Sequence, residues 1–176
     1  MTARRICACA LMAFAACGCA GYRWTSGVPE EYRTVSVPVF ENRTMAAELG
    51  PTVTQYVRRE FQREGTFSLR RTGDAAVEVQ GAIASISRAA ISYDRSFGMR
   101  AREYRYLVTA EVTFIDKKTG RVMADNRKYV AETTFMVQGD ILTGQRNAAA
   151  RVAQDIARQI VDDAAVMPYG AEPSGK

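Results

Sequence analysis

The sequence predicts an α+β fold in which two helices pack on one face of a mostly antiparallel four-stranded sheet. Four segments alternate apolar and polar residues with the period of a strand, and two longer segments repeat apolar residues with the period of a helix. They follow one another in the order strand, helix, three strands, helix, with no internal repeat. With 176 residues, of which 47% are hydrophobic, the chain has room for one domain with a single core.

The first strand is predicted from Val35, Val37 and Val39, which alternate with Ser36 and a proline. Proline cannot donate a hydrogen bond to a neighbouring strand. Pro38 therefore indicates either an edge position in the sheet or the end of the strand.

The first helix is predicted over residues 48–64. Pro51 suits the first turn, where the backbone N–H has no partner within the helix, and Gly65 is typical of a helix end. The apolar face that we expect to pack against the sheet contains Leu49, Val53, Tyr56, Val57 and Phe61.

The second strand is predicted to run from residue 77 to about Tyr93. Apolar residues alternate up to Ile83, whereas Ile86 is out of step with them. An extra residue in a strand produces this change of phase, so we expect a β-bulge near Ala84 or Ser85.

The third and fourth strands are predicted to form a hairpin. Residues 92–102 contain Gly98 and three arginines, and we interpret them as a loop. Apolar residues then alternate over residues 104–114, the clearest strand in the chain. Residues 116–120 read as a turn that ends in a glycine, so residues 121–135 are expected to return as the partner strand.

The second helix is predicted to begin at Asp140, whose carboxylate can cap the first turn, and to end before Pro168. Residues 168–176 are expected to be a disordered tail. The predicted apolar face contains Leu142, Ala149, Val152, Ala153, Ile156, Ala157, Ile160 and Val161.

The amino terminus is typical of a secretory signal. Arg4 and Arg5 precede an uncharged stretch over residues 6–16 that ends in small residues. The uncharged run continues to Tyr22 and so reaches only the lower length limit for a spanning helix, and we therefore favour a cleaved signal over residues 1–18. We assign residues 19–32 to an anchor and tether and residues 33–167 to the folded domain.

Two cysteines at the end of this signal resemble the lipid-accepting cysteine of bacterial lipoproteins. Small residues precede both Cys17 and Cys19. Cleavage at Cys19 would discard every other thiol, whereas cleavage at Cys17 would leave a free thiol in an oxidising compartment. We therefore expect Cys19 to carry the lipid and keep Cys17 as the alternative.

Composition excludes several classes of function. The chain has no histidine, and its four cysteines all lie in the first nineteen residues, so histidine-based nucleophilic catalysis and the usual zinc sites are not expected. We expect no enzyme, cofactor or metal. Without Arg4 and Arg5 the chain has 22 basic and 19 acidic residues, an excess too small to predict nucleic-acid binding.

Several short motifs together resemble one known family. They are Cys19-Ala20-Gly21-Tyr22 at the anchor, Val35-Ser36-Val37-Pro38-Val39-Phe40-Glu41-Asn42-Arg43-Thr44, Ser92-Tyr93-Asp94, and Glu103-Tyr104-Arg105. This combination, which extends over most of the mature chain, is similar to the lipopolysaccharide-assembly lipoprotein LptE. The residues before the anchor depart from the family's pattern, because a bulky aliphatic residue is usual where this chain has Ala16-Cys17.

The resemblance implies an outer-membrane lipoprotein that faces the periplasm, plugs the barrel of the translocon protein LptD and binds lipopolysaccharide. Guanidinium and ammonium groups in loops would contact the phosphates of the lipid. The candidates on this reading are Arg95, Arg100 and Arg102 before the longest strand, and Lys117 and Lys118 in the hairpin turn. The alternative function is another envelope lipoprotein that serves as a ligand carrier or as an adaptor of a transport complex.

Overall fold

The computed structural model describes residues 27–94, 98, 100–137 and 140–169. Its elements, in chain order, are η1 (Glu30–Tyr32), β1 (Thr34–Ser36), β2 (Glu41–Asn42), α2 (Leu49–Glu64), β3 (Ser68–Leu69), β4 (Val77–Asp94), β5 (Arg100–Asp116), β6 (Val122–Met136) and α3 (Ile141–Val166).

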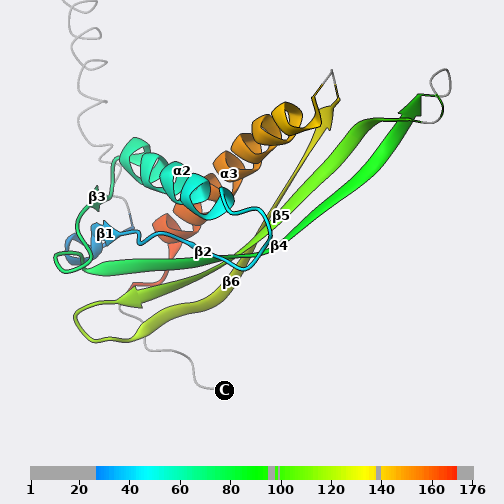
Figure 1. Ribbon diagram of the computed structural model, residues 1–176. Helices are drawn as coiled ribbons and strands as arrows, with labels where there is room; N and C mark the ends of the chain where they lie inside the picture. The colour runs from blue at the N-terminus through cyan, green and yellow to red at the C-terminus, as the bar shows by residue number, and fades with distance from the viewer. Residues whose placement is uncertain (1–26, 95–97, 99, 138–139, 170–176) are drawn as a thin grey trace, which may run out of the picture.

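The sheet confirms the predicted fold class. Its strand order is β3-β1-β4-β5-β6, with β2 also paired to β4 (Figure 1). The three long strands pair antiparallel, whereas β1, β2 and β3 pair parallel to their neighbours. The sheet therefore has six strands instead of four, because β2 and β3 have two residues each and are too short to show an alternation in the sequence.

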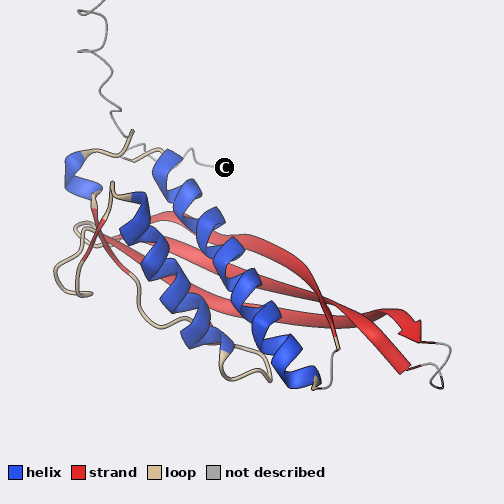
Figure 2. Cartoon of the chain, turned by 90° about the horizontal axis from the view of Figure 1, so that it is seen from above, coloured by secondary structure: helices blue, strands red, loops and turns tan. Residues whose placement is uncertain are grey.

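Helices α2 and α3 lie side by side on one face of the sheet (Figure 2). Between the two layers is one hydrophobic core. Its largest fully buried side chains come from both helices and from the long strands, and they include Phe61, Ile83, Tyr106, Phe114 and Ile156.

The first strand is shorter than its alternation predicts. Val35 and Val37 are buried, but β1 ends at Ser36 and the side chain of Val39 is 63% exposed. Because β1 is flanked by β3 and β4, Pro38 marks the end of the strand and not an edge of the sheet.

Phe40 holds the segment after β1 in the core. A Cβ atom on Gly81 would overlap the ring of Phe40, and a Cβ atom on Gly50 would lie 2.6 Å from its carbonyl oxygen. The backbone N–H of Phe40 donates to the Oγ1 of Thr54 at 2.9 Å. The two glycines therefore let β4 approach the ring of Phe40 and α2 approach its backbone.

Both ends of the first helix are confirmed. Pro51 lies in the first turn of α2, and Gly65 ends the helix in the left-handed conformation with φ of 85°. The predicted bulge in β4 is confirmed as well, since the register with β5 shifts between Ile83 and Ser85.

The predicted loop over residues 92–102 is wrong in extent. β4 continues to Asp94 and β5 begins at Arg100, so Arg100 and Arg102 lie in a strand. The turn signal at Gly98 belongs to the connection alone, and exposed strand positions tolerate arginine well. We call residues 89–94 and 100–105, which pair with one another, the arm; none of these residues is buried.

The second helix begins as predicted, because the carboxylate of Asp140 accepts hydrogen bonds from the backbone of Leu142 and Thr143. Leu142 is wrongly predicted to be in the core: its side chain is 56% exposed in the first turn. Tyr169, in the predicted tail, stacks on Tyr32. None of the described helices is long and apolar enough to cross a membrane.

Candidate functional site

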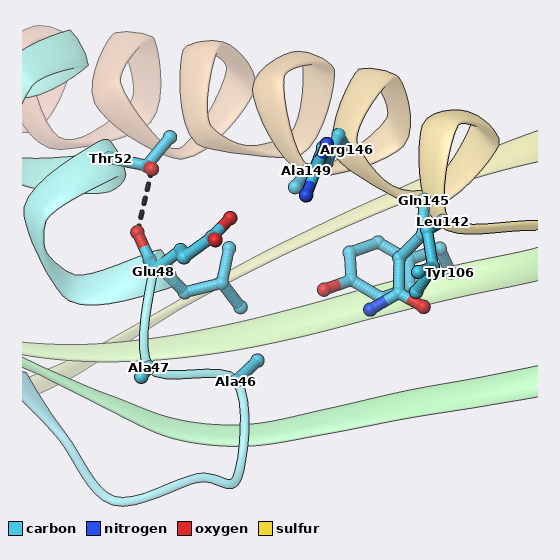
Figure 3. Close-up of a pocket in the computed structure, with 10 residues that line it drawn as sticks. Ala46, Ala47, Glu48, Thr52, Tyr106, Leu142, Gln145, Arg146 and Ala149 are labelled. Atoms are coloured by element: carbon cyan, nitrogen blue, oxygen red, sulfur yellow. Dashed lines mark hydrogen bonds between the residues drawn. The ribbon is translucent and has the colours of Figure 1, made fainter.

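A cleft of about 540 Å³ opens between the first turns of the two helices, at the root of the arm (Figure 3). One wall is formed by the loop before α2 and by its first turn, and the other by the first turns of α3. Tyr106 of β5 contributes its buried ring. The lining residues are Ala46, Ala47, Glu48, Leu49, Thr52, Tyr106, Leu142, Gln145, Arg146 and Ala149.

The walls of the cleft are largely apolar because small and aliphatic side chains dominate them. Ala46, Ala47 and Ala149 leave the space open, and Leu142 is exposed at its side. The hydroxyl of Thr52 has already used its one donor, since its Oγ1 donates to the carbonyl oxygen of Glu48 at 2.6 Å (Figure 3). The cleft can therefore accommodate an apolar group.

Two arginines accompany this apolar surface. Arg146 lines the cleft from α3. Arg88 of β4 is fixed beside it, because its Nη1 donates to the Oε1 of Gln145 at 2.8 Å and its guanidinium lies 5.6 Å from the ring centroid of Tyr104. The one carboxylate in the lining, Glu48, belongs to the opposite wall.

Two of the predicted basic residues, Arg100 and Arg102, lie in the arm, which extends from the end of the domain at which this cleft opens. Arg102 falls at a register shift, between the Ser92–Glu103 and Tyr93–Ala101 pairs, so strict alternation of faces does not extend from Tyr104 to Arg102. Both arginines are exposed, and Arg102 pairs with Asp94 at 3.5 Å. Arg95 lies outside the described residues, as do Cys17 and Cys19.

The other two predicted residues lie at the opposite end of β5. Lys117 and Lys118 belong to the turn before β6, about 50 Å from Arg102 along the strand at about 3.3 Å per residue. Lys117 pairs with Glu78 at 3.1 Å, and Lys118 pairs with Glu31 at 3.4 Å. The structure therefore does not bring the five candidates together.

The Lys117 pair is structural in character, since the side chain of Glu78 is only 6% exposed. Burial opposes ionisation of Glu78, but hydrogen bonds from Gln80 and Lys117 and the charge of Lys117 outweigh it and hold the pKa of the carboxyl below its ordinary value of 4.5. Lys117 thus compensates a buried charge.

The sequence as a whole matches a known family. The model of the lipopolysaccharide-assembly family LptE matches residues 32–164, from η1 to the last turn of α3. This chain belongs to the LptE family. Its members are assembly lipoproteins without enzymatic activity. Membership of a lipoprotein family is consistent with a place in the cell envelope.

Two solved structures have a fold similar to that of this chain. A putative lipoprotein from Caulobacter crescentus is 16% identical, with a TM-score of 0.53 over 78% of this chain and 92% of that one. A protein from Xanthomonas campestris is 9% identical, with a TM-score of 0.55 over 80% and 90% of the two chains. At such identities the likeness concerns the fold alone. No curated protein matches the sequence significantly.

Sequence reasoning missed Arg88 and Arg146 in this LptE-family chain, although both had a signal. The bulge after Ile83 changes the phase of β4, so Arg88 shares a face with Ile86 and not with the polar residues before the bulge. Arg146 is four residues after Leu142, so the two side chains lie on the same side of α3.

Proposed function

We propose that this lipoprotein works in the outer membrane, on the periplasmic side, where it plugs an LptD-type barrel and binds lipopolysaccharide. Its lipid would be attached at Cys19, or at Cys17 as the alternative. The observation that carries the proposal is the apolar cleft with Arg88 and Arg146 beside it and the exposed arginines of the arm beyond.

The chemistry of this surface suits an amphipathic anionic lipid. Lipopolysaccharide has phosphates next to acyl chains, and a guanidinium binds phosphate through two parallel hydrogen bonds. Arg100 and Arg102 are exposed in the arm, the root of which lies beside the cleft. Lys117 and Lys118 are weaker candidates than the sequence suggests, because each already pairs with a carboxylate on the far side of the domain.

The length of the strands is compatible with a plug. Gly27 is eight residues after Cys19, so the start of the described chain is held within about 28 Å of the lipid. From that end of the domain β4 carries the arm in the opposite direction (Figure 1), and its 18 residues span about 60 Å at about 3.3 Å each. That length exceeds the thickness of a bilayer, about 40–45 Å with its headgroups.

A double variant of the arm tests the lipid-binding surface. Replacing Arg100 and Arg102 by alanine should weaken lipopolysaccharide binding by the purified mature lipoprotein at least fivefold, because two phosphate-binding groups are lost. The matched control replaces Arg70 and Arg71, two exposed arginines in the loop between β3 and β4, and should leave binding unchanged. Binding is measured by titration with labelled lipopolysaccharide at fixed salt.

Equal losses in the two double variants would mean that net charge alone drives binding, and would contradict the assigned surface. The barrel is tested separately by tagging the chain and recovering it from detergent-solubilised outer membranes. A large β-barrel should be recovered with it in near-equal amount. Lipopolysaccharide binding without any barrel would instead indicate a stand-alone carrier.

A further inference from the structure

One segment of β4 has a free side. Along its whole length β4 pairs with β5, and on its other side β1 pairs with Val77 and Glu78 while β2 pairs with Ala82 and Ile83. In the part of the chain that the structure describes, no strand pairs with residues 85–90 on that side. We call residues 85–90 the open edge.

The open edge is regular enough to accept a strand. The register between β4 and β5 shifts just before Ser85 and again after Ala90, but between these two irregularities six residues pair with β5 without interruption. Six residues is the usual length of a strand in a globular protein. The irregularities therefore delimit the open edge without disrupting it.

The backbone of alternate residues in the open edge points outward. The carbonyl oxygen of Ile83 accepts from the N–H of Arg43 at 3.1 Å, so Ile83 points away from β5. Ile83 pairs with Ala110 of β5. The partners of Ile86, Arg88 and Ala90 lie two, four and six residues before Ala110 on β5. Because the direction alternates along an antiparallel ladder, these three residues present their N–H and C=O groups to the free side.

The opposite edge of the sheet is treated differently. On β6, the carbonyl oxygen of Val130 accepts from Nε2 of Gln159 at 3.1 Å, and that of Thr134 accepts from Nη2 of Arg151 at 2.9 Å. Side chains of α3 thus occupy backbone acceptors of β6, a form of protection that sheets commonly give to an exposed edge. The described residues give the open edge no such cover.

We propose that the open edge binds an extended segment of the β-barrel partner as an added strand, an inference that rests on the proposed function. A row of alternating N–H and C=O groups is matched by another peptide backbone, whereas an acyl chain has neither group. Ser85, Ser87 and Ala89 are small and exposed, so they leave the approach free. Arg88 favours a segment with an acidic residue.

A second copy of the chain fits this edge less well. In a two-fold pairing that uses all three outward residues, Ile86 of one copy lies opposite Ala90 of the other. This register places Arg88 of one copy opposite Arg88 of the other, which is repulsive.

Amide hydrogen exchange tests the added strand directly, because it reports on the backbone. The full lipid-modified protein is purified with its barrel in detergent, and exchange is compared with that of the same protein alone. Exchange over residues 85–90 should slow at least tenfold in the complex, while residues 128–134 of β6 should change little. A complex without slower exchange in the open edge would overturn the inference and leave the proposed function standing.

A pair of variants gives a second readout. Ala90→Pro removes one outward N–H group and should lower the amount of barrel recovered at least fivefold, whereas Ala90→Thr keeps the N–H group and should recover it normally. Circular dichroism checks that both variants fold. Equal recovery overturns the inference. Failure of the unchanged protein to recover any barrel overturns the proposed function together with it, and slow exchange that appears only as the protein alone is concentrated would assign the edge to a second copy.

Discussion

The body of the domain and the arm have the same sheet in common but differ in what covers it. In the body, α2 and α3 cover one face of the long strands, and aromatic residues such as Phe61 and Phe114 are fully buried between the two layers. In the arm, no residue is buried, and Ile91 and Tyr93 are exposed. The difference indicates that the body supplies most of the folding free energy. Residues of the arm can therefore be replaced at little cost in stability and remain exposed for binding.

The largest expected effect on stability is at Phe40, in the body of the domain. Replacing Phe40 by alanine should reduce the free energy of unfolding by about 3–5 kcal/mol, since it empties a buried site where β4 packs directly against the ring. The measurement is urea unfolding of the mature protein followed by circular dichroism. Phe40→Leu, which keeps most of the buried volume, should lose much less. Equal losses in the two variants would contradict the assignment of this effect to buried volume.

The buried ion pair of the body gives a smaller effect that depends on pH. Lys117→Ala should reduce the free energy of unfolding by about 1–3 kcal/mol at pH 7, because it leaves the ionised Glu78 without its cation. The matched control is Lys118→Ala, which breaks a pair with Glu31 in which both side chains are exposed and should change little.

The sign of the pH dependence follows from the lowered pKa of Glu78. The contribution of the ionised Glu78 to stability is fully present above pH 4.5, the ordinary pKa of the group. It is lost as the pH falls through the lower pKa of the folded state. The difference between the wild type and Lys117→Ala should therefore be largest near pH 7 and shrink toward pH 3. A difference that stays constant over this range would contradict the role assigned to the pair.

Much of the fold could be predicted because it follows from periodicity and local chemistry. The long strands, the bulge after Ile83, the Gly65 end of α2 and the Asp140 cap each have a signal within a few residues. The two-residue strands β2 and β3 have none, because pairing across the sheet defines them. Leu142 is wrongly predicted for a related reason, because the helix period cannot show that this position borders an open cleft.

The candidate site was harder to predict than the fold because it depends on distance in space. Lys117 and Arg102 look alike in the sequence, but one compensates a buried carboxylate and the other projects from the arm. Arg88 was missed because its face is decided by the bulge before it. The open edge also leaves no local signal, since it depends on where β2 stops pairing.

The smallest expected effect lies in the arm. Tyr93→Ser should change the free energy of unfolding by less than about 0.5 kcal/mol, because the side chain is 52% exposed and belongs to a strand pair that neither helix buries. Urea unfolding under the conditions used for Phe40→Ala gives the comparison. A loss as large as that of Phe40→Ala would mean that the arm contributes to the folding core. If the free energy is unchanged, a binding defect in the same variant can be attributed to the surface of the arm, because the amount of folded protein stays the same.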